Sequence, residues 1–200
     1  MIKSKFKPPY WYHDNIQIPN HEVNKIKSII NNAPIEELLD PDKKYLTTYF
    51  YLEKIDTFFD NFYDKLSVEI MKSIGLFDKT KYEIDYWSQF YHKEMTHAPH
   101  NHASTITEDD ADISWVHFID VPDQKCFRFT DTKGNILIPD EQSSGDIICF
   151  PSWVWHEVVP LETDYLRLVT AGNIGFTSHD ELYSYSGSPL NSSGIKKHYT

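Results

Sequence analysis

Three histidines crowd into the stretch His97-Ala98-Pro99-His100-Asn101-His102, around which the rest of the chain is organised. His100 and His102 are two positions apart, and on an extended strand this spacing places both side chains on the same face. A neutral imidazole offers a lone pair near neutral pH without first losing a proton, so two of them can share one cation. The stretch therefore predicts part of a metal site on a strand.

A third ligand has to come from another part of the chain, and His156 is the best candidate. It ends the run Cys149-Phe150-Pro151-Ser152-Trp153-Val154-Trp155-His156, whose apolar residues are typical of a buried strand. Three ligands from two strands would leave the opposite side of the metal open. The alternative is that these histidines are only solvated or hydrogen-bonded. We expect that role for four others: His13, His21, His179 and His198.

Arg167 lies within an apolar run, Tyr165-Leu166-Arg167-Leu168-Val169-Thr170-Ala171. A guanidinium is costly to bury without an anion, and its planar fork fits a carboxylate. On a strand, Asn173 shares the face of Arg167 and would point into the same cavity. We therefore expect an anionic co-substrate beside the metal. The alternative is a structural ion pair between Arg167 and a carboxylate such as Asp146 or Glu157.

The first part of the chain shows helical periodicity. Asn20 suits the N-cap of a helix that ends before Pro34, and residues 35–44 are typical of a connection. Apolar residues recur every three or four positions over 47–74, and Gly75 suits the position just after a helix C-terminus. Residues 16–19 alternate and predict a short edge strand.

From Tyr82 onward the period of the pattern changes to two, which favours strands. Short strand-like runs are separated by turn residues: 82–89, 113–121, 125–130, 136–138, 146–150, 153–159 and 165–174. Many short strands after a helical block predict a fold that is mainly β with α (α+β), an antiparallel sandwich or barrel braced by N-terminal helices. We expect one domain over 1–200, with mostly helical support over 1–80, a β core over 81–176 and a tail over 177–200.

The amino-acid composition limits the binding partners and the cellular compartment that we expect for this chain. The formal net charge of −11 disfavours non-specific binding to nucleic acids or anionic membranes, which reward a basic surface. The two cysteines, Cys126 and Cys149, are too few for a disulfide framework and favour a reducing compartment. No apolar run is long enough to span a bilayer, and the N-terminus lacks the apolar region of a signal peptide. We expect a cytoplasmic protein and leave its oligomeric state open.

These residues resemble the iron(II)/2-oxoglutarate-dependent dioxygenase superfamily, in particular a branch from marine bacteria and their phages. The similarity covers residues 82–176 and is most specific from Phe150 to His156. The other matching elements are Trp87, Gln89, His100-Asn101-His102, Gly145-Asp146, Pro160, Arg167 and Asn173. The resemblance implies that the core is a catalytic double-stranded β-helix (jelly roll). A phage-encoded protein acting in the host cytoplasm is compatible with it.

The resemblance also implies roles for residues. His100, His102 and His156 would bind iron(II), and Arg167 would pair with the distal carboxylate of 2-oxoglutarate. Three residues would line the pocket of that co-substrate: Gln89, Tyr91 and Asn173. Two tryptophans would wall it: Trp153 and Trp155. The implied activity consumes O2 and 2-oxoglutarate, hydroxylates a small molecule or peptide (a prolyl residue or amino acid among the options) and yields succinate and CO2.

The chain departs from the superfamily at one ligand. Most relatives have His-x-Asp or His-x-Glu where this chain has His102, which would give three histidines and one less negative charge. The acidic segment that follows could supply a carboxylate instead: Glu108, Asp109, Asp110 or Asp112. Three histidines also suit zinc. A zinc-binding cupin-like hydrolase or isomerase is therefore a rival, and a non-catalytic jelly-roll structural protein is another.

Overall fold

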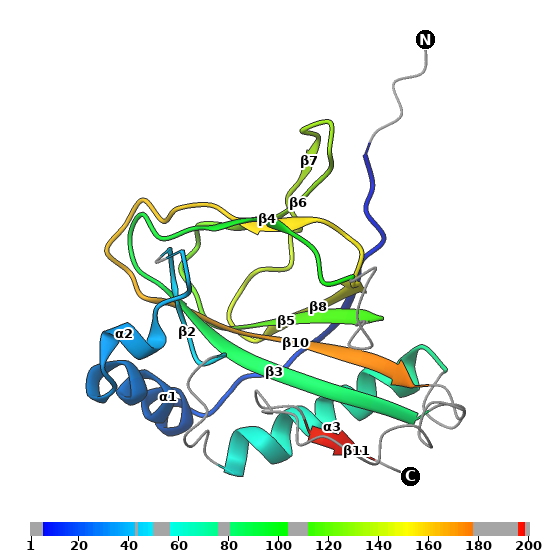
Figure 1. Cartoon of the computed structure of the whole chain (residues 1–200), viewed down its shortest axis with the longest axis horizontal. Coiled ribbons are helices and arrows are strands. Elements are labelled where there is room, and N and C mark those ends of the chain that lie inside the picture. Colours follow the sequence, from blue (N-terminus) through cyan, green and yellow to red (C-terminus); the bar gives the residue numbers. More distant parts are fainter. Residues whose placement is uncertain are drawn as a thin grey trace.

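The computed structural model of the chain describes residues 6–42, 44–49, 57–75, 81–103, 112–177 and 196–198. Two antiparallel sheets face each other, and helices lie on the outer side of the larger one (Figure 1). The larger sheet contains, in order, β1 (Trp11–Asn15), β8 (Asp146–Pro151), β5 (Ile113–Asp120), β10 (Arg167–Thr177), β3 (Lys81–Tyr91) and β11 (Lys196–His198), with β2 (Leu46–Thr47) paired to β3. The smaller sheet contains β4 (His97–His100), β9 (His156–Val158), β6 (Phe127–Thr130) and β7 (Ile136–Leu137). The predicted class, mainly β with α, is confirmed.

The larger sheet separates two hydrophobic cores. On one side it packs against α1 (Asn20–Asn32), α2 (Ile35–Leu38) and α3 (Thr57–Ser73), and on the other against the smaller sheet. Strand β5 is buried on both faces because successive side chains alternate between the cores. Trp115 belongs to the helix-side core, whereas Val116 and Phe118 belong to the core between the sheets.

The predicted start of the long N-terminal helix is wrong. The helix expected from residue 47 begins at Thr57 among the described residues, because Leu46 and Thr47 pair with Phe90 and Gln89 of β3. Tertiary pairing overrides local periodicity here, and residues 50–56 lie outside the described part. The end of the helix is confirmed, since Gly75 has a φ of 75°.

The other differences also come from pairing that the sequence does not display. The edge strand expected over 16–19 lies earlier in the chain. It is β1, because Trp11–Asn15 pairs with the free edge of β8. The connection over 35–44 contains the one-turn helix α2. Strands β1, β2 and β11 bring residues from outside the expected β core into the larger sheet. The division of the chain into support, core and tail stays a prediction.

Helix length also bears on membrane insertion. Among the described residues, no helix combines the length and the apolar character needed to cross a bilayer.

Candidate metal centre

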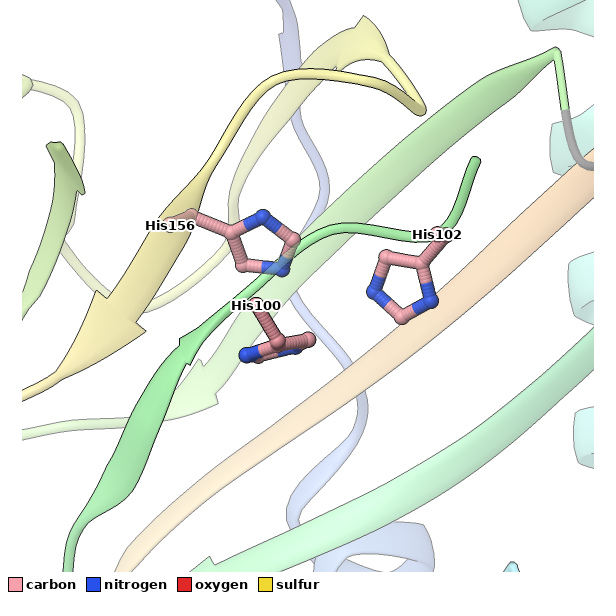
Figure 2. Close-up of side chains that lie close together, drawn as sticks. All are labelled: His100, His102 and His156. Carbon is pink, nitrogen blue, oxygen red and sulfur yellow. The ribbon is translucent and has the colours of Figure 1, made fainter. Parts of the chain in front are cut away.

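Three imidazoles meet, one from the end of β4, one from the coil that follows it and one from the start of β9 (Figure 2). His100 ends β4 and lies opposite His156, which begins β9, in the antiparallel register. His102 follows two residues after β4. Each of the three rings offers one nitrogen, and these nitrogens all lie within 4.8 Å of one another. The remote histidine and the neighbouring pair are therefore brought together as the sequence predicted.

Hydrogen bonds to two backbone carbonyls fix the end of the HxH stretch to the loop that leads into β9. The amide of His102 donates to the carbonyl of Ser152 at 2.9 Å. The side-chain amide of Asn101 donates to the carbonyl of Trp153 at 3.5 Å. Because that loop leads directly into His156, these bonds hold the two parts of the cluster together.

The hydrogen bonds of two rings determine which nitrogen carries the lone pair. Nδ1 of His100 lies 2.8 Å from the carbonyl oxygen of Ala98, and Nδ1 of His156 lies 3.0 Å from that of Val154. A carbonyl only accepts, so each Nδ1 carries the proton and each Nε2 keeps its lone pair. Metal-binding histidines are oriented by bonds of this kind.

Burial keeps the three rings neutral. It disfavours the imidazolium and lowers the pKa of His100, lowers that of His102 to about 3, and lowers that of His156 well below its usual value. At neutral pH the lone pairs are therefore free to bind a cation. The chemistry of the cluster suits a metal with a preference for nitrogen ligands, such as iron(II) or zinc.

A fourth imidazole supports the cluster from one side. The ring of His97 stacks on that of His100, with centroids 3.8 Å apart and planes 19° apart. The ring of Tyr45 lies 4.3 Å from that of His97, and its hydroxyl is 3.3 Å from Nε2 of His97. Sequence reasoning missed Tyr45, because only the pairing of β2 with β3 and a hydrogen bond from Thr96 to Lys44 bring it here.

Arg167 is buried between the sheets, two aromatic rings (Phe118 and Phe127) away from His156, and lacks a counter-ion among the described residues. It is 2% exposed and lies opposite Tyr91 in the register of β10 and β3. Its guanidinium carbon is 5.0 Å from the ring centroid of Tyr91 and 5.7 Å from that of Phe118. Within the described part of the chain, neither Nη1 nor Nη2 has a hydrogen-bond partner. Such a group is ready to bind an anion.

The two carboxylates considered as structural partners of Arg167 are engaged elsewhere. Glu157 accepts a hydrogen bond from Nε of Arg128 at 2.8 Å. Asp146 accepts from Nδ2 of Asn15 at 2.8 Å and from the backbone amide of Ser143 at 2.7 Å. The alternative of an ion pair with either residue is therefore wrong.

A pocket of about 220 Å³ opens next to the histidines. It is lined by Pro41, Tyr45, Tyr49, Trp87, Gln89, His97, His100, His102 and Asn173. Of the residues predicted around the co-substrate, Gln89 and Asn173 line this pocket, whereas Arg167 and Tyr91 are buried and do not line it. The hydroxyl of Tyr91 donates to Oε1 of Gln89 at 3.1 Å and so connects the two regions.

Some of the residues singled out in the sequence lie apart from the pocket. Trp153 and Trp155 are 57% and 41% exposed and do not line it. Asp112 uses its carboxylate to accept from the amide of Phe176 at 2.7 Å. The other acidic candidates, Glu108, Asp109 and Asp110, lie outside the described residues. Within the described ranges, the three histidines are the one cluster of potential metal ligands.

Comparisons with known proteins identify structural relatives. No protein-family model and no curated protein matches the chain. A prolyl-4-hydroxylase from Pseudomonas putida matches with a TM-score of 0.55 and 19% identity, over 84% of this chain and 93% of that one. The collagen prolyl hydroxylase of Paramecium bursaria Chlorella virus-1, solved with 2-oxoglutarate, matches with a TM-score of 0.55 and 15% identity, over 82% and 94%.

A third match widens the range of chemistry within one fold. The non-heme α-ketoglutarate-dependent carbocyclase SnoK of nogalamycin biosynthesis matches with a TM-score of 0.62 and 8% identity, over 93% of this chain and 90% of that one. The expected jelly roll is thus confirmed, and the marine and phage branch stays a prediction. The chain has the fold of the iron(II)/2-oxoglutarate oxygenases.

Proposed function

We propose that this chain is an iron(II)- and 2-oxoglutarate-dependent oxygenase that hydroxylates a small molecule or peptide, with succinate and CO2 as co-products. One observation carries the proposal: three neutral imidazoles converge in the same aromatic core that buries a guanidinium whose two Nη atoms have no partner among the described residues. The fold of the structural relatives supports it.

In this proposal His100, His102 and His156 hold the metal through ring nitrogens. The donor set fits, because burial keeps the rings neutral and carbonyl hydrogen bonds at Nδ1 of His100 and His156 leave Nε2 available. O2 would supply the oxidising power for hydroxylation of a C–H bond, with iron(II) held by the three histidines to activate it and 2-oxoglutarate giving two electrons as it becomes succinate and CO2. The protein holds the reactants in place and excludes water.

Arg167 would hold the distal carboxylate of 2-oxoglutarate, with Tyr91 beside it. The two Nη atoms form a planar fork that suits a carboxylate. Aromatic rings lead from the guanidinium to His156 and form one wall of the site: Phe118, beside the guanidinium, lies 6.1 Å from Phe127, and Phe127 lies 5.5 Å from His156. This apolar wall keeps water away, which strengthens the ion pair.

A cytoplasmic location is part of the proposal. Both cysteines of the chain, Cys126 and Cys149, are buried and free, which supports a reducing compartment.

The test measures succinate in the full chain. Protein purified without oxygen and loaded with iron(II) is expected to convert 2-oxoglutarate to succinate once O2 is admitted. His156→Ala should abolish this conversion, and His92→Ala, which removes an exposed imidazole, should not. A protein that takes up zinc, forms no succinate from iron(II) and 2-oxoglutarate, and hydrolyses or isomerises a substrate would support the zinc rival instead.

A further inference from the structure

Arg167 carries a positive charge that no charge of the described residues offsets. A guanidinium stays protonated in proteins, and this one is 2% exposed, with both Nη atoms unpartnered in the described part of the chain. The titratable groups that the described residues place beside it are the hydroxyl of Tyr91 and the thiol of Cys126. Burial raises the pKa of both groups, so both are neutral at pH 7. Neither neighbour therefore supplies a counter-charge.

Cys126 belongs to the surroundings of Arg167 by its position in the fold. It precedes β6, and its carbonyl accepts a hydrogen bond from the amide of Val159, just after β9, at 2.9 Å. Tyr91 and Phe118, the two rings beside the guanidinium, pack in the same hydrophobic core as Cys126. The guanidinium also acts on the thiol, since it opposes the effect of burial on the pKa of Cys126. Two rings and a thiol thus form an uncharged wall around Arg167.

Two carboxylates influence this wall but do not pair with the guanidinium. Asp40, which adds to the effect of burial on the pKa of Tyr91, accepts a hydrogen bond from the backbone amide of Tyr45 at 3.0 Å. Glu162, which adds to the effect of burial on the pKa of Cys126, is exposed. Among the described residues, no carboxylate therefore serves as the counter-ion.

The chemistry of the guanidinium determines which anion suits it. Burial of a lone cation is costly, and a monovalent anion offsets its charge, whereas a divalent anion would leave a negative charge buried and unpaired. The two Nη atoms form a planar fork that fits the oxygens of a carboxylate, and nitrate presents its oxygens in the same planar arrangement. The site therefore suits a small monovalent anion, and a planar oxyanion fits it best.

We infer that Arg167, walled by Tyr91, Phe118 and Cys126, binds one small monovalent inorganic anion, and that 2-oxoglutarate has to displace it. Binding of the inorganic anion needs no metal, whereas its displacement by 2-oxoglutarate rests on the proposed function. The affinity for 2-oxoglutarate then falls as the concentration of such an anion rises. The anion thereby regulates the proposed enzyme by competition.

The test follows the unfolding of the full, metal-free chain by urea in sodium nitrate, with sodium sulfate keeping the ionic strength constant. Relative to Arg167→Met, the unfolding equilibrium constant of the wild type should fall about tenfold for each tenfold rise in nitrate above its Kd, because nitrate binds only the folded chain. General salt effects are common to both proteins, so the difference isolates Arg167. Arg128→Met is the matched control. It removes a partly exposed guanidinium paired with Glu157 and should respond to nitrate as the wild type does.

Cys126→Asp tests the wall, because it places a carboxylate beside the guanidinium and should abolish the nitrate dependence. Cys149→Asp makes the same change in the helix-side core, at an equally buried thiol whose pKa is raised by burial without an opposing cation. Its carboxylate meets no counter-charge. This control should therefore be the less stable of the two by at least about a hundredfold in the unfolding equilibrium constant, or remain unfolded.

The inference is wrong if the wild type and Arg167→Met respond alike to nitrate. It is also wrong if Cys126→Asp keeps the nitrate dependence or is as unstable as Cys149→Asp. Nitrate should raise the KM for 2-oxoglutarate in the iron(II)-loaded wild type, and an unchanged KM would contradict the displacement. A chain whose unfolding responds to nitrate but which forms no succinate would keep the anion site and contradict the proposed function alone.

Discussion

The two faces of the larger sheet each bury a histidine, and the two differ in what their nitrogens do. On the helix side, Nδ1 of His117 lies 3.2 Å from the hydroxyl of Tyr63 and Nε2 lies 2.9 Å from the carbonyl of Ile16. On the other side, His156 bonds the carbonyl of Val154 through Nδ1 alone and faces two more imidazoles. A buried ring with both nitrogens satisfied stabilises the fold, and one with a spare lone pair is available for chemistry.

The same comparison separates two arginines. Arg128 pairs with Glu157 at 2.8 Å and is partly exposed. Arg167 is buried, and its Nη atoms have no partner in the described part of the chain. Burial of an unpaired cation costs stability, so the fold retains Arg167 for a reason other than stability. Substitutions that affect activity and stability separately can test this contrast.

The largest expected effect comes from the same substitution at the two histidines. His156→Gln should lower succinate formation and metal uptake by at least about a hundredfold, because an amide is a poor ligand for iron(II). His117→Gln should leave both unchanged and lower the free energy of unfolding by about 1–2 kcal/mol, since Tyr63 and Ile16 lose well-aligned partners. Metal analysis, the succinate assay and chemical denaturation measure the pair. Equal losses of activity in both variants would remove the distinction between the two faces.

Replacement of the arginines should give the next largest effect. Arg167→Met should raise the KM for 2-oxoglutarate about a hundredfold, since the carboxylate loses a bidentate partner. It should not lower stability, because it removes an uncompensated buried charge. Arg128→Met should cost about 0.5–1 kcal/mol of stability and leave KM unchanged. The assignment of Arg167 fails if its KM effect is no larger than that of Arg128.

The helix-side histidine also predicts a pH dependence of stability. Burial lowers the pKa of His117 to about 4, although its bond to Ile16 opposes the shift. The unfolded chain has the higher value of about 6.5 and binds the proton first. The stabilising effect is therefore complete above that pH and lost as the pH falls, by about 3 kcal/mol on reaching pH 4.

Unfolding titrations of metal-free wild type and His117→Gln between pH 7 and 4 check this dependence. Other buried histidines contribute equally to both proteins, so the difference between the two curves isolates His117. The free energy of unfolding of the wild type minus that of the variant should rise by about 3 kcal/mol as the pH is raised from 4 to 7, from below zero to the 1–2 kcal/mol expected at neutral pH. Parallel curves would mean that His117 titrates alike in the folded and unfolded chains.

Strand periodicity and residue spacing predict the main strands of the β core and the residues of the candidate metal centre. Alternating residues identify β3, β5 and β10, and the HxH spacing, the apolar run before His156 and the isolated Arg167 identify the cluster. Each of these signals is local, because a strand face is determined by a period of two.

Sequence alone does not predict contacts that depend on pairing between distant segments. The alternation of Ile16-Gln17-Ile18 predicts a strand there, yet the edge of β8 takes Trp11–Asn15. The helical pattern over 47–74 conceals β2, whose pairing with β3 brings Tyr45 to His97. No spacing rule connects Tyr45 with residues about fifty positions later.

Tyr45 gives the smallest expected effect and tests how far the active face extends. Its hydroxyl is 3.3 Å from Nε2 of His97, and the ring of His97 stacks on that of His100. Tyr45 therefore reaches the proposed metal ligand His100 only through His97. Partners bonded directly to ligands change metal affinity tenfold or more, so we expect Tyr45→Phe to weaken iron(II) binding about threefold. Tyr63→Phe, the matched loss of a hydroxyl beside His117, should lower stability and leave metal affinity unchanged. Competitive metal titration measures both, and unchanged affinity in Tyr45→Phe would limit the functional face to the three histidines.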